Sequence, residues 1–190
     1  MEIQEHLKTQ YGFDRFREHQ QEIIQQAING RDTFANLPTS SGKSLLYQFV
    51  ATFTGKVAII VSPLLSLIYD QIHSAQTNGI TAIHLTTMNG HLPFTEYSLV
   101  YTTPETLIAL YNRDRLKCFR DLAENICLFA IDECHCVTQW GHDFRPEYAR
   151  LGVLRETIKS VPIMALTATA VKKTRDYHGA LRPQPAPRQV

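Results

Sequence analysis

Two short segments carry the residue types that handle phosphate groups. The first, Leu37-Pro-Thr-Ser-Ser-Gly-Lys-Ser44, follows a predicted strand and opens a predicted helix, which is the setting of a phosphate-binding loop. In such a loop, backbone N–H groups and the helix N-terminus hold the phosphates. Lys43 would reach the β and γ phosphates, and the Ser44 hydroxyl would help to hold Mg²⁺. Because Leu37 stands where the strict pattern has its first glycine, an ordinary polar turn remains the alternative.

The second segment, Phe129-Ala-Ile-Asp-Glu-Cys-His135, is an apolar stretch that ends in two adjacent carboxylates. Asp132 would hold Mg²⁺, directly or through water, and Glu133 would polarise the attacking water. The alternative is a pair of solvated acids at the end of a strand. Taken together, the two segments favour hydrolysis of a nucleoside triphosphate. The predicted catalytic residues are Lys43, Asp132, Glu133 and His135, and the predicted magnesium ligands are Ser44 and Asp132.

A third group lies between Cys136 and Arg145, where the only tryptophan of the chain occurs in a glycine-containing segment. A core tryptophan normally lies in an apolar run, and Trp140 does not. Trp140 and Phe144, with His142 and Arg145, are typical of a surface that stacks bases and contacts phosphates of single-stranded nucleic acid. A merely ordered loop is the alternative reading of this composition.

Strands and helices that alternate along the chain must position these segments. The pattern predicts an α/β fold with a mostly parallel central sheet flanked by helices, in which ligands bind at the carboxyl ends of the strands. Predicted strands are 33–37, 57–61, 81–84, 99–102, 126–131 and 163–166. Predicted helices are 2–10, 18–29, 43–53, a segment from Pro63 to about Asn78, one after Pro104, and 147–159.

Composition narrows the class of protein. The 190 residues carry a formal net charge of +1, with 44% hydrophobic and 19% charged residues, which excludes a strongly basic nucleic-acid binder but allows a local basic groove. No run approaches the roughly 20 apolar residues of a membrane span, and the start of the chain has no apolar signal region. The four cysteines are expected to be reduced thiols, and no zinc is expected because no pair has zinc-ligand spacing.

Six segments together resemble the first motor lobe of RecQ-family DNA helicases of superfamily 2. The resemblance covers roughly residues 5–176, and the stretch Gln-Trp-Gly-His-Asp-Phe-Arg-Pro-Glu-Tyr is specific to this family. The matching segments are Tyr11–Gln20 (adenine recognition), Leu37–Gln48 (phosphate loop), Ser62–Gln71 (motif Ia), Tyr101–Glu105 (motif Ib), Ile131–Arg150 (motif II and the aromatic-rich loop) and Met164–Ala170 (motif III).

The resemblance implies a RecA-like lobe that uses ATP and Mg²⁺ and acts on single-stranded or partly duplex DNA. Phe13 would stack on adenine, while Arg17 and Gln20 would bond its edge or a neighbouring phosphate. The remaining nucleotide contacts would come from Thr39, Ser40, Ser41, Gly42, Lys43 and Ser44. DNA contacts and coupling of hydrolysis to lobe motion would come from Ser62, Pro63, Thr103, Gln139, Trp140, His142, Phe144, Arg145, Thr167 and Thr169.

The sequence also departs from the family pattern. Ser40 replaces a usual glycine in the phosphate loop, Cys134 replaces a common alanine, and the stretch between Thr87 and Ser98 is short by about a helix, so that a plain loop is expected there. The lobe is expected to span 1–178, followed by a disordered Pro/Arg-rich tail at 179–190. A second motor lobe with its arginine finger and the accessory domains are expected to be absent, so that unwinding by this chain alone would be weak or lacking.

Three functions remain open at this point. The first is the ATP-binding half of a DNA-dependent ATPase and 3′-to-5′ helicase, and the second is a non-catalytic module that binds nucleotide or DNA. A small P-loop kinase or GTPase is a weaker third, because it would have no use for Trp140 or for the Thr167-Ala-Thr169 segment. The protein is expected to be intracellular, in the nucleus of a eukaryote or the cytoplasm of a bacterium, with unknown protein partners.

Overall fold

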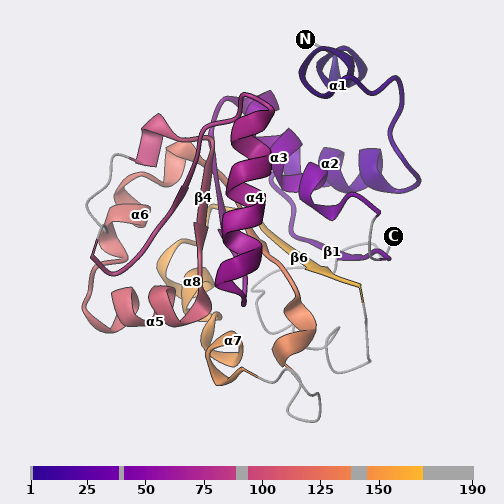
Figure 1. Ribbon diagram of the computed structural model, residues 1–190. Helices are drawn as coiled ribbons and strands as arrows, with labels where there is room; N and C mark the ends of the chain where they lie inside the picture. Colours follow the sequence, from indigo (N-terminus) through magenta and orange to yellow (C-terminus); the bar gives the residue numbers. More distant parts are fainter. Residues whose placement is uncertain (1, 39–40, 89–93, 138–144, 169–190) are drawn as a thin grey trace.

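A six-stranded, all-parallel sheet forms the centre of the molecule (Figure 1). The computed structural model describes residues 2–38, 41–88, 94–137 and 145–168. Within them the strand order is β1-β6-β5-β2-β4-β3, so the two strands that precede the phosphate loop and the acidic pair are separated only by β6. The strands are β1 Thr33–Asn36, β2 Val57–Val61, β3 Ala82–His84, β4 Leu99–Thr102, β5 Ile126–Ile131 and β6 Ile163–Thr167.

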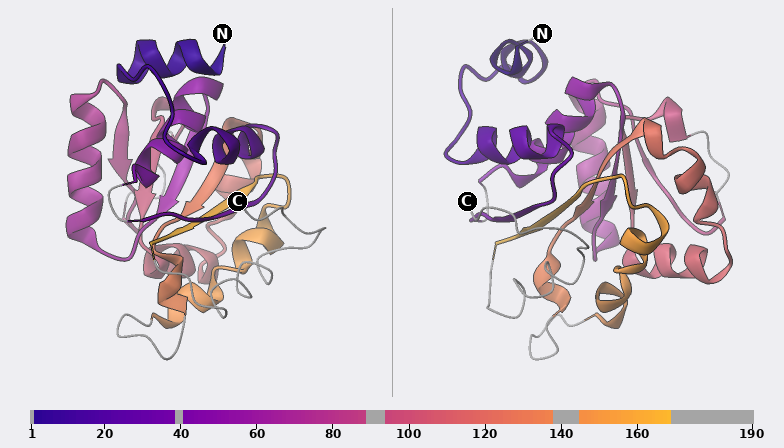
Figure 2. Two further views of the ribbon diagram at one scale, coloured as in Figure 1. Left: turned by 90° about the vertical axis from the view of Figure 1, so that its right-hand side faces the viewer. Right: turned by 180° about the vertical axis from the view of Figure 1, so that it is seen from behind.

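Helices cover both faces of this sheet (Figure 2). One face packs against α1, α2, α3 and α4, and the other against α5, α6, α7 and α8. The bounds are α1 Ile3–Tyr11, α2 Gln20–Ile28, α3 Lys43–Thr54, α4 Leu65–Thr77, α5 Pro104–Asn112, α6 Lys117–Asp121, α7 Pro146–Arg150 and α8 Val153–Thr157, with 3₁₀ turns at η1 Phe94–Glu96, η2 Ala123–Asn125 and η3 Cys134–Val137.

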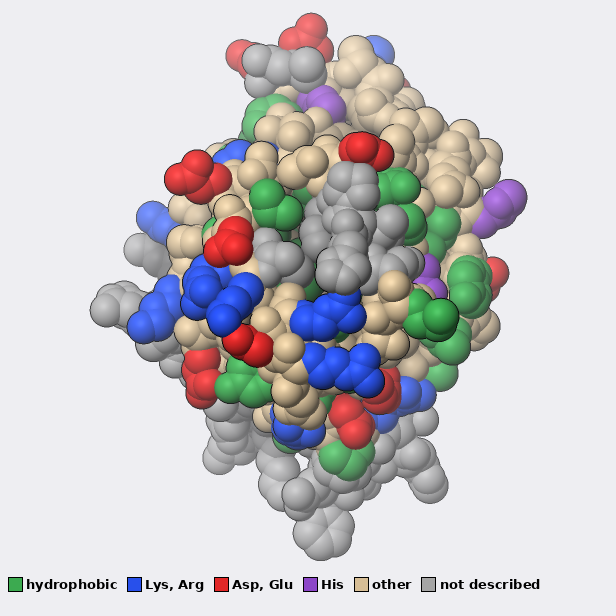
Figure 3. Space-filling view, turned by 90° about the vertical axis from the view of Figure 1, so that its left-hand side faces the viewer, with side chains coloured by type: hydrophobic (Ala, Val, Ile, Leu, Met, Phe, Trp, Pro, Cys, Tyr) green, Lys and Arg blue, Asp and Glu red, His purple; other side chains and the backbone are tan. Residues whose placement is uncertain are grey.

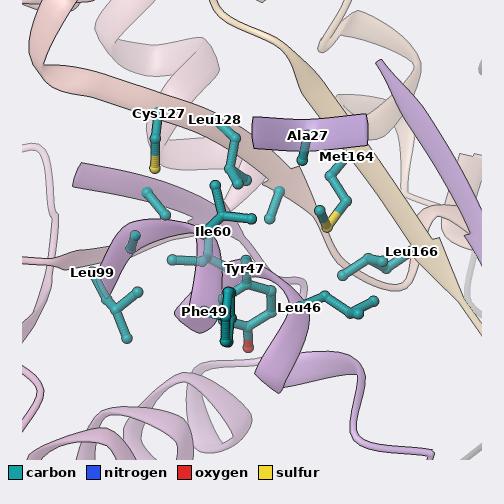
Figure 4. Close-up of a cluster of buried hydrophobic side chains, with 14 of the residues drawn as sticks. Ala27, Leu46, Tyr47, Phe49, Ile60, Leu99, Cys127, Leu128, Met164 and Leu166 are labelled. Atoms are coloured by element: carbon teal, nitrogen blue, oxygen red, sulfur yellow. The ribbon is translucent and has the colours of Figure 1, made fainter. Parts of the chain in front are cut away.

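The central strands are buried on both faces, as their continuous apolar runs predict. Alternate residues of β2 point to opposite faces, so Ile60 joins the cluster under α3 while Ile59 joins the cluster under α5 to α8. Figure 4 shows the first cluster, in which Leu46, Tyr47 and Phe49 of α3 lie close to Ile60, Leu128, Met164 and Leu166 of the sheet. This packing fixes α3, and with it the loop that precedes α3.

The predicted bounds of three strands, 57–61, 99–102 and 126–131, agree with the structure. The predicted helix 147–159 is wrong, because α7 and α8 are separate short helices divided at Leu151 and Gly152. Glycine stabilises a helix interior poorly, and Arg155 ends α8 by donating to the carbonyls of Lys159 and Val161 at 3.0 and 3.2 Å.

Smaller differences concern segments that the pattern did not resolve. The helix predicted at 18–29 begins at Gln20, because His19 adopts a left-handed φ of 64°. Helix α6 and the three 3₁₀ turns were not predicted, and η1 falls within the stretch expected to be a plain loop. Among the described residues, Cys127, Cys134 and Cys136 are buried free thiols. No helix in this part of the chain combines the length and apolarity that a membrane span requires.

Charged side chains of both signs mix on the face formed around α5 and α6. Figure 3 views the molecule from that side, and Asp and Glu lie between the Lys and Arg side chains there. Lys117 pairs with Asp114, and Arg120 lies 4.0 Å from Asp121. This face therefore presents no uniform basic field of the kind that attracts nucleic acid by charge alone.

Candidate functional site

The phosphate loop joins the carboxyl end of β1 to the N-terminus of α3. Gly42 caps α3 with a left-handed φ of 81°, a conformation that glycine adopts without strain. A Cβ atom at this position would lie 2.9 Å from Nε2 of Gln20, so a larger residue would displace the Gln20 amide. Lys43 and Ser44 begin α3, and backbone N–H groups at a helix N-terminus suit an anion. Thr39 and Ser40 lie outside the described residues.

Gln20 ties the N-terminal segment to this loop. Its side chain is 2% exposed, and its amide nitrogen donates to the Ser41 carbonyl at 2.9 Å and the Gly42 carbonyl at 3.4 Å. Its amide oxygen accepts from the Arg17 backbone N–H at 3.0 Å. The structure thus uses Gln20 to hold the loop, and a contact of Gln20 or Arg17 with adenine stays a prediction.

The two phenylalanines of the N-terminal segment have different environments. Phe16 packs on Phe49 of α3 with ring centroids 5.2 Å apart, so it belongs to the core. Phe13 is 52% exposed, although large apolar side chains are usually buried. An exposed aromatic ring can stack on a nucleotide base, which is the role predicted for Phe13.

The acidic pair lies at the carboxyl end of β5, where it meets the lysine of the loop. Nζ of Lys43 lies 3.4 Å from Oε1 of Glu133, a contact between residues 90 positions apart. The two side chains are 14% and 27% exposed. Glu133 has a left-handed φ of 49°, which is strained for a residue with a side chain and typical of functional sites. The structure therefore brings the two predicted phosphate-handling segments together.

The electrostatics of Asp132 follow from burial. Desolvation and the neighbouring Glu133 carboxylate raise the pKa of Asp132 to about 6, against the opposing effects of Lys43 and of the N–H of Glu133. Burial and the neighbouring carboxylate destabilise the anionic form of Asp132, and a nearby cation would stabilise it. Carboxylate and hydroxyl oxygens are also the ligands that Mg²⁺ prefers. The donor set of Asp132 and Ser44 therefore fits that ion.

His135 links the acidic pair to the neighbouring strand. Its Nδ1 atom lies 3.2 Å from Oε2 of Glu133 and 3.0 Å from Oγ1 of Thr167. Thr167 is fully buried at the end of β6. A chain of contacts therefore runs from Lys43 through Glu133 and His135 to Thr167, one of the two residues predicted to couple hydrolysis to motion. Thr169, the other one, is not among the described residues.

The predicted DNA-contacting residues differ in accessibility. Ser62 is 2% exposed and Pro63 is buried. Thr103 is 9% exposed, and its hydroxyl caps α5 by accepting from the Thr106 N–H at 3.2 Å. Direct side-chain contacts of these residues with a DNA backbone stay predictions that this burial does not favour. Gln139, Trp140, His142 and Phe144 lie outside the described residues.

A groove of about 500 Å³ lies beside these buried residues, at the carboxyl ends of β2 and β4. Arg145 lines it, and its guanidinium lies 3.1 Å from the Glu105 carboxylate. Leu64 and Leu65, each 51% exposed, form an apolar wall of the groove, and their residue type did not predict this place. The sequence signal that could have indicated them is their position within the segment Ser62–Gln71, which resembles motif Ia. The groove is lined by Pro63, Leu64, Leu65, His84, Thr103, Glu105, Thr106 and Arg145.

Known proteins resemble this chain over most of its length. The sequence model of the DEAD/DEAH box helicases matches residues 17–177. The probable ATP-dependent DNA helicase RecS of Bacillus subtilis is 39% identical over 99% of this chain and 39% of its own length. The RecQ-like DNA helicase BLM of Xenopus laevis is 41% identical over 89% of this chain and 13% of its own length. The chain thus spans well under half of the relatives it matches.

A solved structure supports the same fold. The DUF1998 helicase MrfA bound to DNA superposes with a TM-score of 0.70 at 20% identity, over 94% of this chain and 28% of that one. The parallel sheet, the loop before α3 and the acidic end of β5 are those of a RecA-like helicase lobe. The resemblance to the first motor lobe of RecQ-like helicases is confirmed, and the chain belongs to the DEAD/DEAH box helicase family.

Proposed function

We propose that this chain is the ATP-binding motor lobe of a RecQ-like, 3′-to-5′ DNA helicase, with residues 1–178 as the lobe and 179–190 as a tail. The observation that carries the proposal is the 3.4 Å contact between Lys43 and Glu133, which joins the phosphate loop to the acidic pair. The similarity to named DNA helicases supports DNA as the polymer. The same similarity supports an intracellular location, in the nucleus of a eukaryote or the cytoplasm of a bacterium.

Each residue of the site has a distinct task in ATP hydrolysis. The N–H groups at the start of α3 and the Lys43 ammonium hold the phosphates, and Phe13 stacks on the adenine. Asp132 and Ser44 hold Mg²⁺, which when bound neutralises charge on the phosphates. Glu133 accepts a hydrogen bond from the attacking water and orients it, since its carboxylate is partly exposed beside Lys43. His135 holds Glu133 in place through Oε2.

The groove beside β2 and β4 is the proposed path of single-stranded DNA. Leu64 and Leu65 give the groove an apolar wall, and the Arg145 guanidinium gives it a positive charge that can bind a phosphate. Arg145 directly follows the aromatic segment with Trp140 and Phe144, whose rings suit base stacking. Because Glu105 pairs with Arg145 at 3.1 Å, a phosphate would compete with that carboxylate.

The test is ATP turnover by the 190-residue chain with and without a single-stranded oligonucleotide, for the wild type and Lys43→Ala. We expect turnover that the oligonucleotide raises several-fold and that Lys43→Ala abolishes. A tightly bound nucleotide without turnover would favour the alternative, a non-catalytic module that binds nucleotide or DNA. A chain that neither binds nucleotide nor hydrolyses ATP would overturn the proposal.

A further inference from the structure

The peptide group between Asp132 and Glu133 is held at both of its ends. Its N–H, which belongs to Glu133, donates to Oδ1 of Asp132 at 3.0 Å. Its carbonyl, which belongs to Asp132, accepts from the Tyr148 hydroxyl at 2.8 Å. This peptide plane determines where both side chains of the acidic pair point, because one precedes it and the other follows it.

The same peptide leads into a strained residue. Glu133 has a φ of 49°, a conformation that costs a non-glycine residue free energy and persists only where its surroundings impose it. Beyond Glu133 the chain turns into η3, where the Cys136 N–H donates to the Glu133 carbonyl at 3.0 Å. The Tyr148 hydroxyl reaches the backbone of this turn from another element, α7.

Tyr148 is itself firmly placed. Its side chain is fully buried among the apolar residues under α5 to α8, and burial raises the pKa of its hydroxyl well above the ordinary value. Its backbone N–H donates to the Arg145 carbonyl at 3.0 Å. The Arg145 N–H in turn donates to the Cys136 carbonyl at 3.0 Å, which closes the base of the segment that contains Trp140.

We propose that Tyr148 is a positioning residue for ATP hydrolysis, whose hydroxyl fixes the Asp132–Glu133 peptide and thereby aims the two carboxylates. The inference rests on the proposed function and adds a residue that the sequence reasoning did not assign. Without the hydroxyl, the Asp132 carbonyl loses its partner and the strained turn can relax. Glu133 then no longer points at the water, while the phosphate loop, which binds the nucleotide, is unchanged.

The test compares Tyr148→Phe with Thr54→Val in the 190-residue chain. Both changes remove one hydroxyl that donates to a backbone carbonyl, and Thr54 donates to the Val50 carbonyl at 2.7 Å at the C-terminal end of α3, the end opposite the phosphate loop. We expect Tyr148→Phe to lower kcat about tenfold, with kcat counted per nucleotide-binding site, and to leave KM for ATP within about twofold. Thr54→Val should leave both values unchanged. An unchanged kcat, or a KM that rises as kcat falls, would overturn the inference.

A second readout separates this inference from the proposed function. Hydrogen exchange of the Glu133 amide, followed by NMR, reports the peptide directly and needs no turnover. We expect exchange about fivefold to tenfold faster in Tyr148→Phe, as for loss of one buried hydrogen bond, and no change in Thr54→Val. A chain that binds no nucleotide but shows this acceleration would sink the proposed function alone. Equal exchange in wild type and Tyr148→Phe would sink the positioning role.

Discussion

Two ionic clusters at opposite ends of the sheet are built differently. Near the start of β1, Arg155 lies 2.6 Å from Asp32, and the same carboxylate oxygen accepts from the Ile163 N–H at 2.8 Å. The guanidinium also donates to the carbonyls of Lys159 and Val161. At the carboxyl end, Lys43 lies 3.4 Å from Glu133, whose backbone is strained.

This difference in hydrogen bonding fits a structural role for the Arg155 cluster and the proposed catalytic role for the Lys43 cluster. The Arg155 cluster has short, multiple hydrogen bonds and joins α8 to the sheet, so it stabilises the fold. The Lys43 cluster has longer contacts. In the part of the chain that the structure describes, the hydroxyls of Ser41, two residues before Lys43, and of Ser62, directly after β2, are buried without a hydrogen-bond partner. Under the proposed function, the Lys43 cluster must rearrange around phosphate and water, so its groups are not expected to be optimally paired with one another.

Glu133→Gln tests the carboxyl end and should have the largest effect. The amide keeps the size of the side chain but loses the charge that we propose polarises water, so ATP turnover should fall at least about 100-fold. The melting temperature should not fall, because the change also removes a like charge beside Asp132. Turnover assays and thermal melting check both expectations. A variant that melts much earlier than the wild type would contradict the comparison.

Arg155→Ala tests the opposite end. It leaves Asp32 with a charge that has lost its partner, in side chains only 10% and 21% exposed, so the free energy of unfolding should fall by about 3 kcal/mol. Urea unfolding measures this change. The control is Arg120→Ala, whose pair with Asp121 is exposed and 4.0 Å long, and it should change the value by less than about 0.5 kcal/mol. Equal losses of unfolding free energy in Arg155→Ala and Arg120→Ala would show that the Arg155 cluster has no special role in stability.

Gly42→Ala sharpens the contrast at the phosphate loop. The added Cβ meets Gln20 at 2.9 Å in a left-handed backbone, so nucleotide affinity should fall about tenfold. Gly30→Ala is the matched control, because Gly30 has a similar φ of 73° with no atom within 4 Å of the added carbon. Calorimetric titration with nucleotide measures both variants. Equal affinities in the two variants would show that the Gln20 contact is irrelevant to the loop.

Substitution of His6 should have the smallest effect, a change in how the free energy of unfolding depends on pH. It is 7% exposed, bonded to Thr52 at 2.9 Å and packed against Phe49 and Phe53, and burial lowers its pKa. The folded chain therefore binds this proton less readily than the unfolded chain. Its stabilising contribution is present above the ordinary pKa of about 6.5 and is lost as pH falls below it.

His6→Gln should flatten this dependence, because glutamine can bond Thr52 without titrating. Unfolding measured between neutral and mildly acidic pH checks the slope, with the exposed His73→Gln as the control. A slope that stays the same in His6→Gln would show that acid sensitivity arises elsewhere in the chain.

Much of the fold was predictable because its signals are local. The apolar runs at 57–61 and 126–131 predicted buried strands with correct bounds, and Gly-Lys-Ser after a strand predicted the loop. The break between α7 and α8 was not predictable, because the apolar spacing of Tyr148, Leu151 and Leu154 suits a continuous helix. Arg155 holds α8 through a contact with Asp32, 123 positions away, which no local pattern indicates.

The sequence alone determined the chemistry of this protein: a lysine and a serine after a glycine turn, and two acids after an apolar strand. It determined these features because residue type and short spacing carry them. Only the tertiary structure decided that Lys43 meets Glu133, that Gln20 holds the loop, and that Tyr148 reaches the Asp132 carbonyl. Such contacts join elements far apart in the chain, and they follow from strand order and side-chain packing rather than from any local pattern.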